Sequence, residues 1–213
     1  MRKLLLALGF WLGAIAAASA QCVAVGGVNS VPQPGMSCLS EPTVGSYTAT
    51  GVGIVPAASA TDIACLTGSA TRTIRVQRVR VSGTAGTLIN VPALVTKHTV
   101  ANTGGTAGTG TQLPVPAAVD SANAAATATA TSYVSANPTV DATATIITAA
   151  ILPLALTGTA LGSTGIIFDF GDLNYAEKPT LRGVAQQLCV NLNATSPSSG
   201  LVNVAFYWTE APQ

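Results

Sequence analysis

Strict alternation of apolar and polar side chains near the C-terminus is the feature that most constrains the fold. Between residues 200 and 209, Val202, Val204, Phe206 and Trp208 alternate with Asn203, Ala205, Tyr207 and Thr209. Side chains two residues apart lie on the same face of a β-strand, so one face of this segment is suited to a core. The pattern predicts a strand over residues 200–209.

A second strand is predicted over residues 71–82, with one irregularity. Ile74 and Val76 share one parity, whereas Val79 and Val81 have the opposite parity. A single extra residue near Gln77-Arg78 would bring all four aliphatic side chains to one face, which is what a β-bulge does. We therefore expect a bulged strand with a fully buried inner face.

Short β-branched runs separated by Gly, Pro, Asn and Ser continue through most of the chain. They predict further strands at 47–55, 61–67, 88–98, 142–151, 164–170 and 180–193. This number of short strands predicts an all-β fold, an antiparallel β-sandwich with jelly-roll-like character, over residues 46–213. Residues 21–45 have no sustained periodicity and are expected to form an irregular N-terminal arm.

One segment, residues 121–136, departs from the strand pattern. It is rich in Ala and Thr, follows Asp120-Ser121 as a candidate N-cap, and ends at Asn137-Pro138. Alanine favours a helix and threonine opposes it. We expect a short crossover helix here, with a flexible Thr/Ala linker as the alternative.

The first 20 residues have the pattern of a secretory signal peptide. Arg2 and Lys3 precede an apolar run over residues 4–18, and Ala18-Ser19-Ala20 is a small-x-small cleavage site. The apolar run is shorter than the ~20 residues that a membrane-spanning helix needs. We expect cleavage after Ala20, a secreted or periplasmic protein, and no membrane insertion of the mature chain.

The charge of the chain is low and nearly balanced. The sequence has nine Lys and Arg and eight Asp and Glu, so loss of Arg2 and Lys3 leaves seven and eight, a formal −1. A nearly neutral protein has no general attraction to nucleic acid. Charged residues make up 8% of the chain, about a third of the usual ~25%, which is typical of secreted and assembly proteins.

All four cysteines follow the expected cleavage site, and export favours their oxidation. Four cysteines allow three pairings. We favour Cys22–Cys38, which would close a Pro/Gly-rich loop in the arm, and Cys65–Cys189, which would join an early strand to a late one. Four free buried cysteines are the alternative.

Residues that would carry catalysis are sparse. His98 is the single histidine, with no Asp or Glu within three residues, and we interpret it as a structural residue at a strand end. A Ser-His-Asp triad and a zinc centre would both depend on His98, and no GxSxG motif is present. The sequence therefore predicts neither an enzyme nor a cofactor.

Paired carboxylates form an alternative candidate site. Asp169 and Asp172 bracket Phe170-Gly171 at a predicted strand end, and Glu177 follows. Two carboxylates about 5–10 Å apart can hydrolyse glycosides, and carboxylates with nearby carbonyl groups can bind Ca²⁺. The simpler interpretation is a strand that ends in a turn, where an Asp accepts a hydrogen bond from its own backbone.

A row of arginines, Arg72, Arg75, Arg78 and Arg80, is the densest charge after the signal peptide. The bulge would place Arg75, Arg78 and Arg80 together on the outer face of their strand. They are a candidate site for an anionic partner, or a solvated face whose charge opposes aggregation. Aromatic residues interleaved for base stacking are absent, which argues against nucleic acid.

Three stretches carry a resemblance: residues 69–83 (SATRTIRVQRVRVSG), residues 99–106 (TVANTGGT), and residues 181–193 with the terminal WTE of Trp208–Glu210. Together they resemble small β-sandwich proteins of unassigned function encoded in tailed-phage and prophage regions of proteobacteria. The resemblance spans roughly residues 60–210. It implies a virion-associated structural or adhesive role without catalytic residues.

The sequence thus predicts a non-enzymatic structural or surface-interaction protein. Its partner would be protein, through self-association or neighbouring structural subunits, or a surface polysaccharide. The alternative is an exported carbohydrate-active or calcium-dependent carbohydrate-binding protein that uses Asp169 and Asp172.

Overall fold

A computed structural model describes residues 44–157, 165–172, 177–197 and 199–213, all within one compact unit, Pro42–Gln213. Its elements are β1 (Gly45–Ile54), β2 (Asp62–Thr67), β3 (Arg72–Ala85), β4 (Ile89–His98), a 3-10 turn (Gly110–Gln112), β5 (Val115–Ala118), β6 (Thr129–Ser132), β7 (Thr145–Leu156), β8 (Ile166–Asp169), β9 (Thr180–Leu181), β10 (Gln187–Asn191) and β11 (Leu201–Pro212). The all-β prediction is confirmed. The predicted signal peptide, and the predicted arm as far as residue 43, lie outside the described residues.

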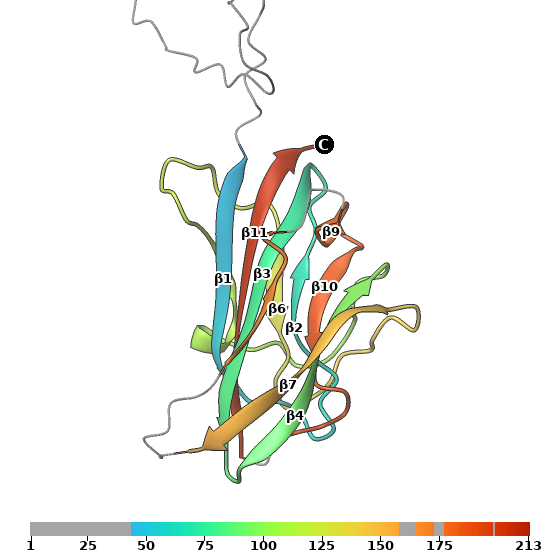
Figure 1. The fold of residues 1–213 in the computed structure, drawn as a ribbon. Helices are drawn as coiled ribbons and strands as arrows, with labels where there is room; N and C mark the ends of the chain where they lie inside the picture. Colours follow the sequence, from blue (N-terminus) through green and yellow to red (C-terminus); the bar gives the residue numbers. More distant parts are fainter. Residues whose placement is uncertain (1–43, 158–164, 173–176, 198) are drawn as a thin grey trace, which may run out of the picture. The chain divides into compact units, whose positions relative to one another are not determined.

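The strands form one continuous sheet in the order β5-β1-β11-β3-β7-β4-β10-β2-β6 (Figure 1). Strands β8 and β9 also pair with β3, beside β7 along the same edge. All pairings are antiparallel except the short parallel contact of β3 with β7 at Thr84 and Ala85. The end strands β5 and β6 lie against each other, so the sheet curls around its own core.

The predicted antiparallel sandwich with jelly-roll order is therefore not confirmed in its details. One half of the observed sheet contains β5, β1, β11 and β3, and the other contains β7, β4, β10, β2 and β6. The halves are joined where the end of β7 pairs in parallel with the end of β3. The alternation pattern alone predicts two separate antiparallel sheets. Because β7 pairs with strands of both halves, the structure has one mixed sheet instead.

Strand β3 contains the predicted bulge. Its pairing with β11 shifts between Tyr207 and Trp208, whose partners are Arg78 and Val76, so Gln77 is the extra residue. As a result, the four aliphatic residues of β3, Ile74, Val76, Val79 and Val81, are all fully buried. The alternation of β11 is confirmed in the same way, since Val202, Val204, Phe206 and Trp208 are buried.

The crossover helix predicted within residues 121–136 is wrong. The described structure there consists of turns and extended chain, then β6, which pairs with β2, and a single β-bridge at Tyr133. The buried carboxylate of Glu210 accepts hydrogen bonds from the backbone amides of Thr127 and Ala128 and from the Thr127 hydroxyl. These bonds use amides that a helix would need for its own backbone, and the β-branched threonines then continue as a strand.

The core is centred on the inner faces of β3 and β11. Trp208 and Phe206 are its largest fully buried side chains. The indole of Trp208 stacks on Tyr47 of β1 with a centroid distance of 5.9 Å, and its Nε1 donates to Glu210 Oε1 at 3.0 Å. The stacked pair therefore packs β1 against β11. Trp208 also positions the Glu210 carboxylate, which accepts the hydrogen bonds from residues 127 and 128.

Deletion of Gln77 is expected to abolish stable folding. Without the bulge, Ile74 and Val76 would turn outward relative to Val79 and Val81, at a cost of about 3–6 kcal/mol for the two side chains. Urea denaturation followed by circular dichroism measures the effect. The matched control, Gln77→Ala, keeps the residue count and loses only the hydrogen bonds of the amide with Thr209 and Lys178, about 1–2 kcal/mol. A deletion variant as stable as this control would contradict the assigned register.

Candidate functional site

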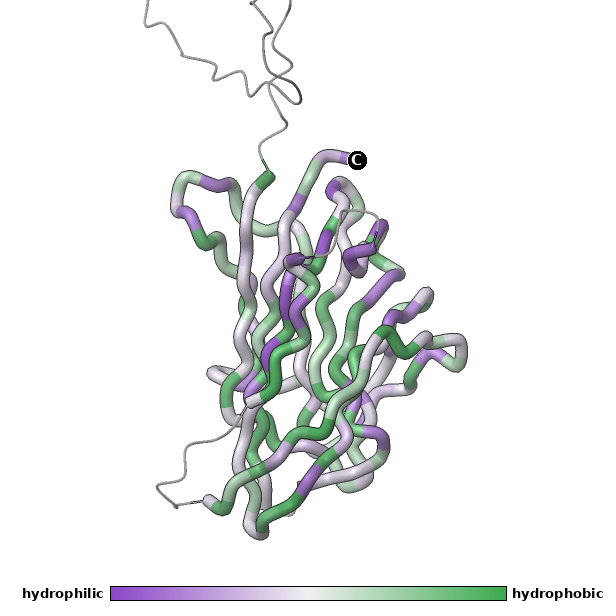
Figure 2. The backbone as a smooth tube through the Cα atoms, in the orientation of Figure 1, coloured by the Kyte–Doolittle hydropathy of each residue, from purple (hydrophilic) through white to green (hydrophobic). Residues whose placement is uncertain are grey.

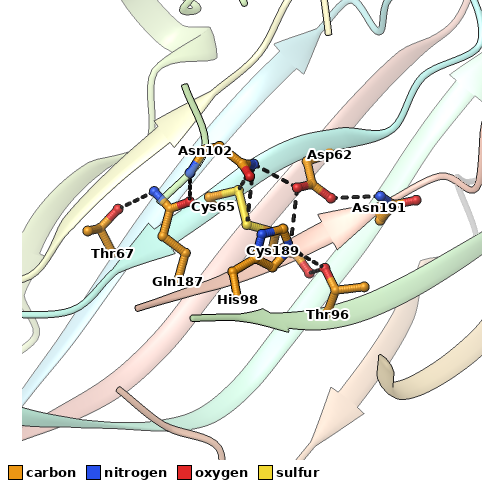
Figure 3. The surroundings of a disulfide bond; sticks show 9 residues. All are labelled: Asp62, Cys65, Thr67, Thr96, His98, Asn102, Gln187, Cys189 and Asn191. Atoms are coloured by element: carbon orange, nitrogen blue, oxygen red, sulfur yellow. Dashed lines mark hydrogen bonds and ion pairs between the residues drawn. A yellow bond between two sulfur atoms is a disulfide. The ribbon is translucent and has the colours of Figure 1, made fainter. Parts of the chain in front are cut away.

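A group of buried and half-buried polar side chains lies on the outer side of strands β4, β10 and β2, beneath the loop that follows β4 (Figure 3). The strand registers bring it together: Cys189 lies opposite both Cys65 and Thr96, Gln187 opposite both Thr67 and His98, and Asn191 opposite Asp62. Asn102 closes the group from the loop. We call these nine residues the buried polar cluster: Asp62, Cys65, Thr67, Thr96, His98, Asn102, Gln187, Cys189 and Asn191.

A disulfide between Cys65 and Cys189 occupies the centre of the cluster. The two residues are direct neighbours on antiparallel strands, with Cα atoms 4.1 Å apart, which is the spacing of closely approached cross-strand pairs. The predicted pairing of Cys65 with Cys189 is confirmed. Cys22 and Cys38 lie outside the described residues, so their predicted pairing stays a prediction.

Asp62 and His98 lie beside the disulfide, and both are fully buried. Asp62 Oδ1 accepts a hydrogen bond from Asn191 Nδ2, and Asp62 Oδ2 accepts one from Asn102 Nδ2, each at 2.7 Å. His98 Nε2 lies 3.4 Å from Asp62 Oδ2 and 3.0 Å from Thr96 Oγ1. The carboxylate is thus held by two amide groups and one imidazole, which offsets the cost of burying its charge.

His98 is the last residue of β4, as predicted for a strand-end residue. Its contact with Asp62 was not predicted, because the two residues are far apart in sequence and meet only through the order β4-β10-β2. One feature of the sequence could have pointed to a role for Asp62, since it is a carboxylate at the start of a strand that is otherwise mostly apolar.

The loop that follows β4, residues 99–109, covers the cluster, and we call it the roof loop. The backbone amide of Asn102 donates to Gln187 Oε1 at 2.8 Å, and its side chain reaches Asp62 and both sulfurs. Short β-bridges, Thr103 with Thr139 and Ala107 with Tyr133, join the loop to residues 133–139. The Tyr133 side chain packs on the disulfide, and burial raises the pKa of its hydroxyl.

Asp141 anchors the start of this roof. Its Oδ2 accepts hydrogen bonds from the amides of Thr99 and Val100, and its Oδ1 accepts from the amide and hydroxyl of Thr143. The bonds from Thr143, followed by that from the Thr99 amide, hold the pKa of Asp141 well below its ordinary value. This carboxylate therefore stays ionised and keeps both segments together.

The arginine row lies on the outer face of β3, as the bulge predicts. Arg78 and Arg80 are exposed, and Arg75 is half-buried. The row does not form one uniform site, since Arg78 makes an ion pair with Asp169 at 2.6 Å while Arg80 and Arg75 line different pockets.

Two surface pockets are formed by the described residues at these arginines. One, of about 320 Å³, lies on the outer face of β1, β11, β3 and β8 and includes Arg80 and Tyr207. The other, of about 400 Å³, combines four basic side chains with Glu177; they are Arg75, Lys97, Lys178 and Arg182. The second pocket is therefore the more basic of the two.

Asp169 makes the backbone hydrogen bond expected of a strand that ends in a turn. Its Oδ1 accepts a hydrogen bond from the Gly171 amide at 2.8 Å, and its Oδ2 accepts two from Arg78. The Gly171 amide and then Arg78 hold the pKa of Asp169 below its ordinary value. Asp172 is exposed, and neither residue lines either pocket described above. These contacts complete a turn at the end of β8.

No protein-family model, no curated protein and no solved structure matches this chain. The resemblance to phage-encoded proteins therefore stays a prediction. Among the described residues, no helix is long and apolar enough to cross a membrane.

Replacement of both cysteines, Cys65→Ala with Cys189→Ala, is expected to lower the free energy of unfolding by about 5 kcal/mol. The disulfide closes a loop with a sequence separation of 124 residues, and the estimate is the entropy that this loop loses in the unfolded chain. Guanidinium denaturation of the variant and of the parent measures the difference. A loss below about 1 kcal/mol would show that the crosslink contributes little beyond the packing around it.

Acidification is expected to open the roof loop before the sheet unfolds. Because the pKa of Asp141 is depressed in the folded state, its contribution is complete above the unfolded pKa of about 4 and is lost as the pH falls toward the folded value. Amide hydrogen exchange at Thr99 and Val100 measures the opening, with Leu94 of β4 as the internal control. Asp141→Asn should show the opening already at neutral pH; unchanged exchange in this variant would contradict the anchoring role.

Proposed function

We propose that this protein is a non-catalytic structural module that associates with further copies of itself through the outer side of β7. The observation that carries the proposal is that β7 combines an uncharged, apolar, solvent-exposed surface with an unpaired edge. Association with a virion or a surface assembly, the role that the sequence resemblance implies, would bring such copies side by side.

Strand β7 exposes unusually many large apolar side chains. Its 12 residues contain no charge, and Figure 2 shows it mostly in the green of apolar residues. Four of its side chains are substantially exposed: Ile146, Ile147, Ile151 and Leu156. On neighbouring β4, the half-buried Pro92 and Leu94 pair with Ile151 and Ala149 and extend the surface. Exposed large apolar side chains gathered on one strand are typical of interaction sites on soluble proteins.

The backbone of β7 supports the same proposal. From Thr145 to Leu154, its strand pairing among the described residues is with β4 alone, so the opposite edge presents unpaired amide and carbonyl groups. Native proteins usually protect such an edge with charged residues, and β7 has none. An extended strand from a partner could add to this edge by backbone hydrogen bonds.

A second copy of the chain suits this edge for an electrostatic reason. Across a two-fold axis, β7 would pair antiparallel with β7 of the other copy, so residue i of one strand would face residue j of the other, and like charges brought opposite each other would repel. Because β7 is uncharged along its whole length, no repulsion of that kind opposes self-pairing.

Sedimentation velocity tests the proposal. The parent is expected to self-associate with increasing concentration, and Ile146→Lys with Ile151→Lys to shift it to monomer, because burial of two ammonium groups between copies is costly. The matched control is Val115→Lys with Val119→Lys, two equally exposed residues of another part of the surface, which should leave association unchanged. A monomeric parent, or equal behaviour of both variants, would overturn the proposal.

A further inference from the structure

The buried polar cluster contains the side chains of a zinc site. The ligand atoms of Asp62, His98 and Cys189 lie within 4.8 Å of one another, and Cys65 is bonded to Cys189. Two cysteines, one histidine and one carboxylate are the ligand types that Zn²⁺ takes in tetrahedral protein sites. In the disulfide, however, both sulfurs are bound to each other.

The orientation of His98 adds an independent observation. The Thr96 hydroxyl lies 3.4 Å from the carbonyl oxygen of Cys189, to which it donates, and 3.0 Å from His98 Nε2. This arrangement suits the tautomer in which Nε2 carries the hydrogen and the Thr96 oxygen accepts it. In that tautomer Nδ1 of His98 carries a lone pair, and this fully buried atom has no hydrogen-bond partner among the described residues. A buried acceptor without a donor is unusual, and the imidazole lies beside the sulfurs (Figure 3).

Groups around these four side chains resemble the outer shell of a metal site. Asn191 and Asn102 each donate to one oxygen of Asp62 and fix the orientation of the carboxylate. The same Asn102 amide lies 3.5 Å from Cys65 Sγ and 3.9 Å from Cys189 Sγ, where it can donate to thiolates. Thr96 holds the imidazole through Nε2, as partners of metal-bound histidines do.

We propose that the cluster is a redox-gated zinc site, closed in the disulfide form and opened by reduction. A dithiol donates two electrons and two protons to the Cys65–Cys189 bond and becomes a disulfide itself. The two thiols then lose their protons to solvent as Zn²⁺ binds both thiolates, His98 Nδ1 and Asp62. Oxidation of the thiolates by a disulfide reverses these steps and releases the metal.

Because of where the two sulfurs lie, the change from disulfide to zinc site involves side chains and not the strands. Cys65 and Cys189 lie on paired strands whose register is fixed by neighbouring backbone bonds on both sides. Cleavage of the sulfur–sulfur bond therefore separates two side chains without moving the strands.

Cobalt binding to the reduced protein tests the proposal, with Co²⁺ as a spectroscopic substitute for zinc. The chain carries Cys22→Ser and Cys38→Ser, so that Cys65 and Cys189 are its only cysteines. It is reduced with a dithiol, which is then removed without oxygen. Equimolar Co²⁺ binding is expected, with thiolate-to-cobalt charge-transfer bands and the intense visible bands of tetrahedral cobalt. Zn²⁺ should displace the cobalt, and affinity should rise with pH because thiol protons are released.

Ligand variants separate the site from two free thiols. His98→Gln should weaken binding by at least about 100-fold and Asp62→Asn by at least about 10-fold. Thr67→Val, a cluster residue outside the ligand set, should bind like the parent. Circular dichroism of the reduced protein reports whether the sheet persists. Four results would each overturn the proposal: no cobalt binding after reduction, equal binding by the disulfide form, unchanged affinity in both ligand variants, or binding only by an unfolded reduced chain.

Discussion

The pairing of β3 with β11 is the interaction on which the rest of the structure depends. It runs from Arg72 to Thr84 and buries the inner face of both strands, and the bulge at Gln77 keeps that face apolar on either side of it. The opposite edge of β3 is shared by β9, β8 and β7 in turn. One long, once-interrupted strand therefore sets the register of β11 and the point where β7 joins the two halves of the sheet.

The buried polar cluster depends on hydrogen bonds that offset the cost of removing its polar groups from water. Polar side chains on the outer side of β4, β10 and β2 would ordinarily face water, yet here the roof loop covers them. Covering them is tolerable because Asn102 and Asn191 satisfy Asp62, and because Gln187 fixes the loop backbone through Asn102. Asp141, which stays ionised, holds the same loop where it leaves β4.

Local sequence patterns predicted much of this architecture. The features that they missed depend on contacts between residues far apart in the sequence. Alternation located β11, the change of parity in β3 located the bulge, and cysteine position suggested Cys65–Cys189. The helix expected over 121–136 failed because Glu210, far along the chain, takes the amides of Thr127 and Ala128. The contact of Asp62 with His98 depends on strand order, which no local pattern encodes, and the four-residue strands β5 and β6 are too short for periodicity to show.

The positions of the two ends have a mechanical consequence. Gly45 at the start of β1 lies opposite Glu210 near the end of β11 (Figure 1). Tension between these ends would load the β1–β11 hydrogen bonds one after another, as in unzipping, and not all together in shear. Extension would stop at the covalent link between Cys65 and Cys189, since the chain between them lies inside the closed loop. Under load, the segments before β2 and after β10, which include β1 and β11, would be extended, while the chain between the two cysteines would bear no tension.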